Sequence, residues 1–134
     1  MSFAFVFPGQ GSQSLNMMAG FAAHPVVRAT FDEAGSVLDL DLWGMLTAES
    51  PDAINQTVNT QPLMLAAGVA VWRAWRAAGG ALPAAVAGHS LGEYSALVVA
   101  DSLAFADAVR LVRLRAEAMQ AAVPAGTGAM AAIP

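Results

Sequence analysis

The chain contains no cysteine, and this absence excludes several kinds of chemistry. Without thiols there is no disulfide, no thiolate metal site and no cysteine nucleophile. With only His24 and His89, a histidine-rich metal site is not expected either. Cationic residues are few, 6 Lys+Arg against 10 Asp+Glu, and they form no cluster. A nucleic-acid-binding surface is therefore not expected.

The sequence also lacks the features of a secretory signal and of a membrane span. The first cationic side chain is Arg28, so the apolar start has no basic segment before it. The longest uncharged stretch near the middle carries Asn, Gln, Thr and Pro in its first half. At 134 residues the chain is long enough for one domain with a real core. We expect a cytoplasmic protein without membrane contact.

Apolar runs and turn residues alternate in an order typical of an α/β protein. Residues 3–7 and 83–88 are predicted to be short strands, the first of them buried on both faces. Helices are predicted over 25–38, over 62–80 beginning at Pro62, and over 103–122. The second of these is apolar nearly all round before Arg73, so we expect it to be buried between layers. Residues 49–61 look rich in turns, and 129–134 look like the start of another strand.

The strongest chemical motif is GHSLG, residues 88–92, which lies between a predicted strand and a predicted helix. This G-x-S-x-G pattern is typical of a sharp turn that exposes a nucleophilic serine, here Ser90. Glycine on either side lets neighbouring backbone pass without a Cβ clash. The backbone N–H of Leu91 is then a natural donor to an oxyanion. The alternative is that Ser90 only caps a helix.

Neither histidine is a convincing base for Ser90. His89 is adjacent in sequence, and side chains of adjacent residues at a sharp turn point apart, so we expect it to pack or hydrogen-bond beneath the turn. His24 precedes Pro25 at the start of a predicted helix and is expected at the surface. The sequence thus presents a nucleophile without its base.

Arg115 falls on the apolar side of the last predicted helix. At about 100° per residue it lies with Ala108, Leu111 and Met119, whereas Arg110 and Arg113 lie on the polar side. A guanidinium keeps its charge, so on such a face it needs a carboxylate, carbonyls or an anionic ligand. A structural ion pair and a clamp for a substrate carboxylate are both consistent with this position.

Gln10 lies in PGQGSQ, directly after the first predicted strand. The segment lacks the third glycine of a dinucleotide-binding loop and lacks the Gly-Lys-Ser/Thr of a P-loop. If the two predicted strands are neighbours, both end beside Ser90. The side-chain amide of Gln10 or the N–H groups of its loop would then reach an oxyanion there.

Five segments together resemble the amino-terminal half of the malonyl-CoA:acyl carrier protein transacylase family: FVFPGQGSQ, NTQP, GHSLGEYSAL, FADAVRLVRLRAEAMQ and GTGAMAAI. The resemblance implies transfer of a malonyl group from malonyl-CoA to acyl carrier protein in fatty acid biosynthesis. It implies an acyl-enzyme at Ser90, an oxyanion hole from Gln10 and Leu91, and substrate binding by Arg115 and Met119. The scheme needs no metal and no cofactor.

The same resemblance implies a fold and a domain boundary. Residues 1–124 would be the amino-terminal part of a large α/β-hydrolase-like subdomain with short parallel strands between helices. Residues 125–134 would begin a small ferredoxin-like subdomain. The carboxy-terminal half, which holds the family's catalytic histidine, would lie beyond Pro134, so the isolated fragment is expected to be inactive.

Other functions stay open at this point. A polyketide-synthase acyltransferase would use the same chemistry with a different carrier. A non-catalytic fragment that binds a partner is a further alternative. A plain esterase is disfavoured, because it has no need for Arg115 on the apolar face.

Overall fold

The computed structural model describes residues 2–124 and 126–129. The first elements in chain order are β1 (Ala4–Phe7), the short 3-10 helix η1 (Ala19–Phe21), α1 (Pro25–Leu38), α2 (Leu42–Leu46) and α3 (Asp52–Asn55). They are followed by α4 (Thr57–Ala77), β2 (Ala85–Gly88), α5 (Gly92–Val99) and α6 (Phe105–Ala121). Within the described ranges, no helix combines the length and the apolar character needed to cross a bilayer.

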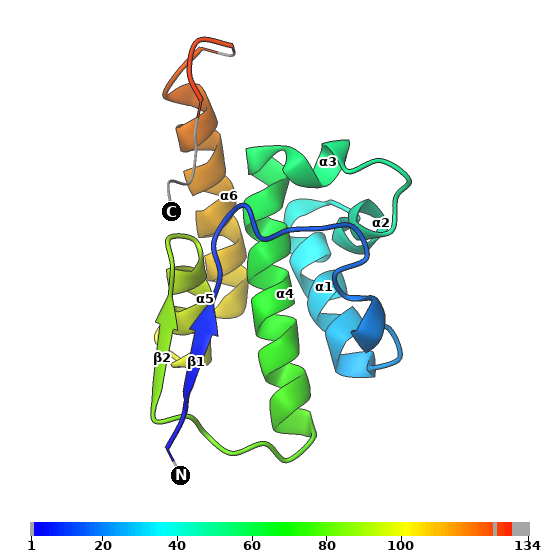
Figure 1. Ribbon diagram of the computed structural model, residues 1–134, viewed down its shortest axis with the longest axis vertical. Coiled ribbons are helices and arrows are strands. Elements are labelled where there is room, and N and C mark those ends of the chain that lie inside the picture. The colour runs from blue at the N-terminus through cyan, green and yellow to red at the C-terminus, as the bar shows by residue number, and fades with distance from the viewer. Residues whose placement is uncertain (1, 125, 130–134) are drawn as a thin grey trace.

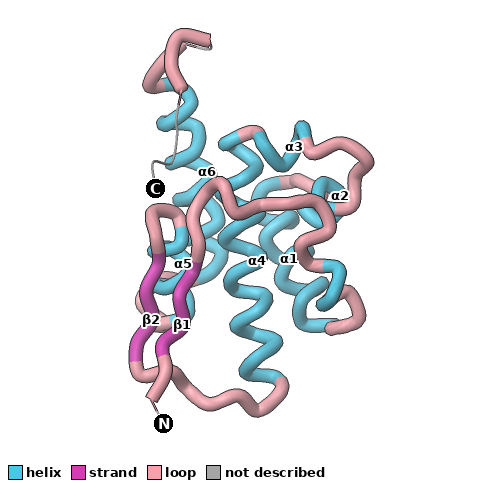
Figure 2. The backbone as a smooth tube through the Cα atoms, viewed as in Figure 1, coloured by secondary structure: helices cyan, strands magenta, loops and turns pink. Residues whose placement is uncertain are grey.

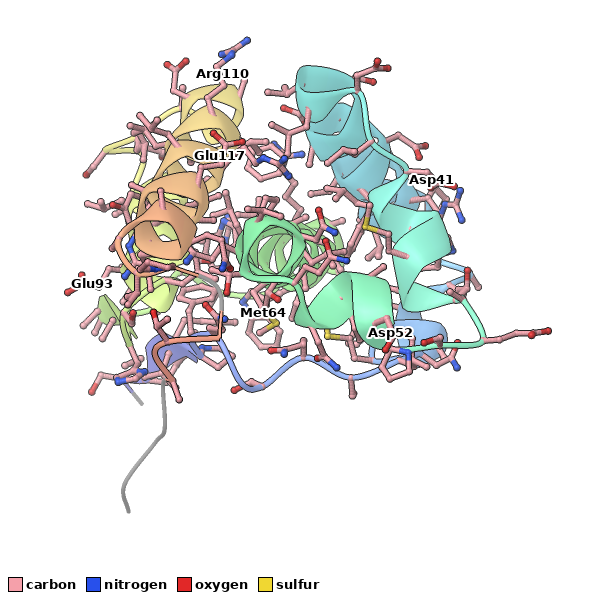
Figure 3. The ribbon with its side chains drawn as sticks, turned by 90° about the horizontal axis from the view of Figure 1, so that it is seen from above. Asp41, Asp52, Met64, Glu93, Arg110 and Glu117 are labelled. Carbon is pink, nitrogen blue, oxygen red and sulfur yellow. The ribbon has the colours of Figure 1, made fainter. Side chains whose placement is uncertain are left out.

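Helix α4 is the centre of the molecule. Seen along its axis, it lies between α1 and α6 (Figure 3). Its buried residues run from Thr60 to Ala70, which confirms the predicted burial between layers. The main hydrophobic core surrounds it and takes large side chains from four other helices: Phe31 of α1, Leu42 of α2, Ile54 of α3 and Val109 of α6.

The predicted start of this helix was wrong. Pro62 lies inside α4, which begins at Thr57, and part of the stretch predicted as turns forms α3. The carbonyl of Gln56 accepts hydrogen bonds from the N–H groups of Asn59 and Thr60, each at 2.8 Å, and so opens the helix more than a turn before the proline. The polar residues of this stretch are therefore helical, and Thr57 contacts the loop that follows β1.

Strands β1 and β2 form a two-stranded parallel sheet that pairs Ala4 with Ala85 and Phe7 with Gly88 (Figures 1 and 2). This confirms the two predicted strands, and it meets the condition, set for Gln10, that they are neighbours. Phe5 packs edge-on against Trp72 of α4, with ring centroids 5.3 Å apart. Burial on both faces was wrong: Val6 points the other way and is 74% exposed. Among the described residues, helices cover only one face of this sheet.

The two outer helices match the prediction closely. Helix α1 has the predicted bounds, and α6 lies within the predicted 103–122. The apolar side predicted for α6 is buried in part: Ala108 is buried and Met119 is partly buried, but Leu111 is 43% exposed. The other buried residues of α6 are Phe105, Val109, Val112 and Ala116. The further strand predicted at 129–134 falls, apart from Ala129, outside the described residues.

Candidate active site

Ser90 lies at a sharp turn between the end of β2 and the start of α5. Its backbone has φ of +53°, a conformation that costs energy for a residue with a side chain. Such strain is typical of a serine held out of the regular backbone for chemistry, and Ser90 is exposed. The structure thus contains the strand–turn–helix context that the GHSLG motif requires.

Close backbone packing explains both glycines of the motif. A Cβ on Gly88 would collide with the backbone carbonyl of Gly92. A Cβ on Gly92 would collide with the carbonyl oxygen of Phe7. In each case the obstacle is backbone, which has no flexible end to move aside. The absence of these two side chains lets β1, the turn and α5 meet.

We expect Gly92→Ala to destabilise the protein strongly, because the new methyl group forces β1 away from α5. The loss should be on the order of 2–4 kcal/mol, measured by urea unfolding. Gly20→Ala is the matched control, since a Cβ there has nothing within 4 Å. Equal stability of the two variants would mean that this close approach is not required.

Arg115 reaches Ser90 from α6. Its Nη2 donates to Ser90 Oγ at 3.0 Å, and its Nη1 donates to Gln61 Oε1 at 2.9 Å. The guanidinium carbon lies 6.0 Å from the ring centre of Tyr94. Two residues that are 25 positions apart in sequence thus meet at one point.

The contacts of Arg115 differ from those of most other arginines. Four arginines pair with a carboxylate: Arg28 with Asp32, Arg73 with Glu33, Arg110 with Asp107, and Arg113 with Glu117. Within the described residues, no carboxylate forms an ion pair with Arg115. The structural ion pair considered for this arginine is therefore not found there, and the guanidinium faces the hydroxyl of Ser90.

The loop after β1 runs beside the same turn. A Cβ on Gly9 would lie 2.8 Å from the carbonyl oxygen of His89 and 3.6 Å from Ser90 Cβ. The side chain of the next residue, Gln10, turns to α4, where its Nε2 donates to Thr57 Oγ1 at 3.0 Å. Its Oε1 is buried, and the described residues provide it with no hydrogen-bond donor. Of the two donors considered at Gln10, the side-chain amide thus uses one of its two N–H groups on Thr57.

Leu91 presents an unusual backbone donor. The residue is completely buried, with an exposed fraction of 0%. Within the described part of the chain, its N–H donates to no acceptor, and neither does the N–H of Gln10. Buried N–H groups without a partner are rare in folded proteins. This one immediately follows Ser90.

The two histidines do not bond to the serine in the part of the chain that the structure describes. His89 is exposed, and its Nδ1 would lie 3.1 Å from a Cβ on Gly9. The expectation that it packs or hydrogen-bonds beneath the turn was wrong, because His89 is exposed and its side chain forms no hydrogen bond with the described residues. His24 is exposed and precedes the first residue of α1, as predicted for a surface residue.

A cavity of about 260 Å³ lies at the carboxy-terminal end of α6. Met119 and Thr57 line it, and Met119 Sδ also accepts a hydrogen bond from Gln61 Nε2 at 3.2 Å. The remaining lining comes from Gln120, Val123, Pro124, Gly126, Gly128 and Ala129. A series of hydrogen bonds thus runs from Met119 at the cavity through Gln61 and Arg115 to Ser90.

Known proteins are similar in sequence to this chain over nearly its whole length. A model of the acyl transferase domain matches residues 4–134. The chain belongs to this family. The acyl transferase domain is 57% identical over 132 residues to the malonyl CoA-acyl carrier protein transacylase of Salmonella typhimurium, and 46% identical over 131 residues to that of Bacillus subtilis. These matches cover 98% and 97% of this chain but 43% and 41% of the relatives.

Solved structures agree with the fold of this acyl transferase domain. The acyl-carrier-protein S-malonyltransferase of Burkholderia pseudomallei matches with a TM-score of 0.90 and 58% identity, covering 92% of this chain and 40% of that one. A malonyl-transacylase in complex with a type II polyketide synthase acyl carrier protein matches with a TM-score of 0.92 and 55% identity, covering 95% and 41%. The short parallel strands between helices are therefore those of an acyltransferase fold.

Gln61 and Thr57 are site residues that the sequence did not identify. Gln61 is fully buried and touches both Arg115 and Met119. The available signal was its place in NTQP, directly before Pro62. Because the start of α4 was predicted at Pro62, both residues fell in a stretch predicted as turns. Without helical periodicity there, no side of the segment could be predicted to point toward the acyl transferase site.

Proposed function

We propose that this acyl transferase domain carries out malonyl transfer from malonyl-CoA to the phosphopantetheine thiol of acyl carrier protein, as part of fatty acid biosynthesis. The contact of Arg115 Nη2 with Ser90 Oγ, at 3.0 Å, carries the proposal. In a malonyl thioester only one CH₂ group separates the reacting carbonyl from the carboxylate. A cation this close to the nucleophile therefore matches a substrate with a carboxylate at that short distance.

Ser90 is the nucleophile in this scheme. Its Oγ attacks the thioester carbonyl carbon, the carbon–sulfur bond breaks, and coenzyme A leaves as the thiol. The thiol of acyl carrier protein then attacks the malonyl ester of Ser90 and restores the hydroxyl. The exposed position of Ser90 on a strained turn supports this role.

The oxyanion of each tetrahedral intermediate would be bound by backbone N–H groups. Leu91 supplies one, because its N–H directly follows the nucleophile and bonds to no described acceptor. Gln10 supplies the other through its main chain, whose N–H bonds to no described acceptor, whereas its side-chain Nε2 already bonds to Thr57. Donors fixed in advance need no reorganisation as the charge develops.

Substrate binding is assigned to Arg115 and Met119. The fork of Arg115 would hold the malonyl carboxylate by two parallel hydrogen bonds. Gln61 keeps one edge of that fork in place, and Met119 contributes an apolar wall beside the cavity at the end of α6. Thioester and carboxylate are then fixed at the two ends of a short acyl group.

The general base is assigned to a histidine outside residues 1–134. Among the described residues, the hydrogen bond of Ser90 Oγ is the one with Arg115, which cannot accept a proton. The chain spans 43% of the Salmonella relative, and we infer that the base belongs to the part of the relatives that this chain does not span. The isolated fragment would then be nearly inactive.

The finer description of the fold is a proposal as well. Residues 1–124 would form the amino-terminal part of an α/β-hydrolase-like large subdomain, and 125–134 would begin a ferredoxin-like small one.

A polyketide acyl carrier protein is the second candidate partner, because one structural relative is a complex with such a carrier. Transfer rates to the two kinds of carrier protein would distinguish the pathways.

Arg115→Ala in the full-length protein should change substrate choice. Losing a bidentate charged contact should lower kcat/KM for malonyl-CoA roughly tenfold to hundredfold. Acetyl-CoA has no carboxylate and should be affected much less. The ratio of the two specificity constants, measured for both proteins, isolates this contact.

Arg110→Ala is the matched control, because Arg110 lies on the same helix, pairs with Asp107 and points away from α4 (Figure 3). It should leave the ratio unchanged. Equal losses for malonyl-CoA and acetyl-CoA in Arg115→Ala would contradict the carboxylate clamp and would favour a structural role.

A further inference from the structure

Pro62 leaves a carbonyl in α4 without its usual hydrogen bond. In an α-helix the N–H of each residue bonds to the carbonyl four residues before it, and proline has no N–H. The carbonyl affected here is that of Val58, in the first turn of α4, on a partly buried residue. A carbonyl left unpaired at such a place destabilises the fold unless another donor reaches it.

Arg113 of α6 is that donor. Its Nη1 lies 3.1 Å from the carbonyl oxygen of Val58 and 3.4 Å from Asn59 Oδ1, while its Nε bonds to Glu117 at 2.7 Å. The side chain is 29% exposed, compared with 62% for Arg110, whose pair with Asp107 lies on the open surface. Arg113 was predicted on the polar side of its helix, and the structure adds a bond from it to a neighbouring helix.

This bond has a counterpart on the other side of α6. Arg113 and Arg115 are two residues apart, so they leave the helix about 200° from each other. Arg113 reaches Val58, and Arg115 reaches Gln61, about one turn further along α4. Val112 and Ala116 of the same helix are completely buried. If α6 rolled about its axis in either direction, one of the two hydrogen bonds would lengthen.

We propose that Arg113 is a positioning residue for Arg115. By bonding to the carbonyl that Pro62 leaves free, it fixes the rotation of α6 on α4 at the point where the guanidinium of Arg115 meets both Gln61 and Ser90. The inference rests on the proposed function, because it assigns Arg113 an effect on malonyl binding through Arg115. Within the described residues, the hydrogen bonds of Arg113 go to Val58, Asn59 and Glu117, and not to Ser90 or Gln61.

A double-mutant cycle in the full-length protein tests this role. Arg113→Leu should lower kcat/KM for malonyl-CoA about fivefold, mainly through KM, with a smaller loss for acetyl-CoA. Pro62→Ala restores an N–H that can bond to Val58, so in that background Arg113→Leu should cost less than about twofold. Arg113→Lys keeps the charge and one donor and should recover part of the loss. Arg110→Leu is the control for removing an arginine from α6.

The outcomes separate the possible causes. Equal losses from Arg113→Leu in the parent protein and in the Pro62→Ala background would overturn the proposal, since the effect would then not depend on the free carbonyl. A loss no larger than that of Arg110→Leu would overturn it as well. Urea unfolding of the same four proteins of the cycle reports the hydrogen bond without any substrate. If the parent protein forms no malonyl ester on Ser90, the proposed function is refuted, and with it the effect of Arg113 on the reaction. The coupling free energy between the two substitutions in urea unfolding would still report the hydrogen bond.

Discussion

Replacing Ser90 with alanine in the full-length protein should abolish the malonyl-enzyme intermediate. Ser90 is held on a strained turn with φ of +53°, is exposed, and bonds to Arg115. The chain has no cysteine that could act in its place. Removing the nucleophile of such a unit lowers turnover by roughly six orders of magnitude.

Intact-mass measurement after mixing with malonyl-CoA checks this result. The parent protein should gain one malonyl group, and Ser90→Ala should gain none. Ser102→Ala is the control, because Ser102 is also exposed and follows the same helix α5, but its hydroxyl donates to the backbone carbonyl of Ala100. A malonyl adduct that persists on Ser90→Ala would mean that another residue is the nucleophile.

The parts of the site that depend on local sequence could be predicted. The sharp turn at Ser90 requires glycine at 88 and 92, because neighbouring backbone passes too close for a Cβ there. The G-x-S-x-G motif contains both glycines and therefore predicts the turn. The inward position of Arg115 follows from helical spacing. The pairing of β1 with β2 was a condition of the argument for Gln10, and the structure meets it.

The parts that depend on partners far along the chain could not be predicted. Thr, Asn and Gln before Pro62 favour turns in isolation, yet they are helical here because α4 starts on the carbonyl of Gln56 and packs against α6. The bonds of Gln61 to Arg115 and of Arg113 to Val58 span 54 and 55 residues, and no pattern within α4 or α6 indicates them. Similarly, an apolar run such as 3–7 does not show whether helices will cover one face of the sheet or both.

Residues 1–134 alone should transfer malonyl on the order of a thousandfold or more slowly than the full-length protein. The proposed nucleophile, the N–H of Leu91 and the proposed carboxylate clamp all lie within these residues, but no base reaches Ser90 within the described residues. A positioned general base contributes typically about 10²–10⁴-fold to a rate, and the loss grows when the residues act as a unit. The oxyanion donors should leave a small residual activity. The assay is malonyl transfer to acyl carrier protein by the fragment, alone and with the remaining part of the full-length protein added separately, after circular dichroism has verified that the fragment is folded. Full-rate transfer by the fragment alone would place a base within residues 1–134, and the exposed His89 beside Ser90 would then be the first residue to replace.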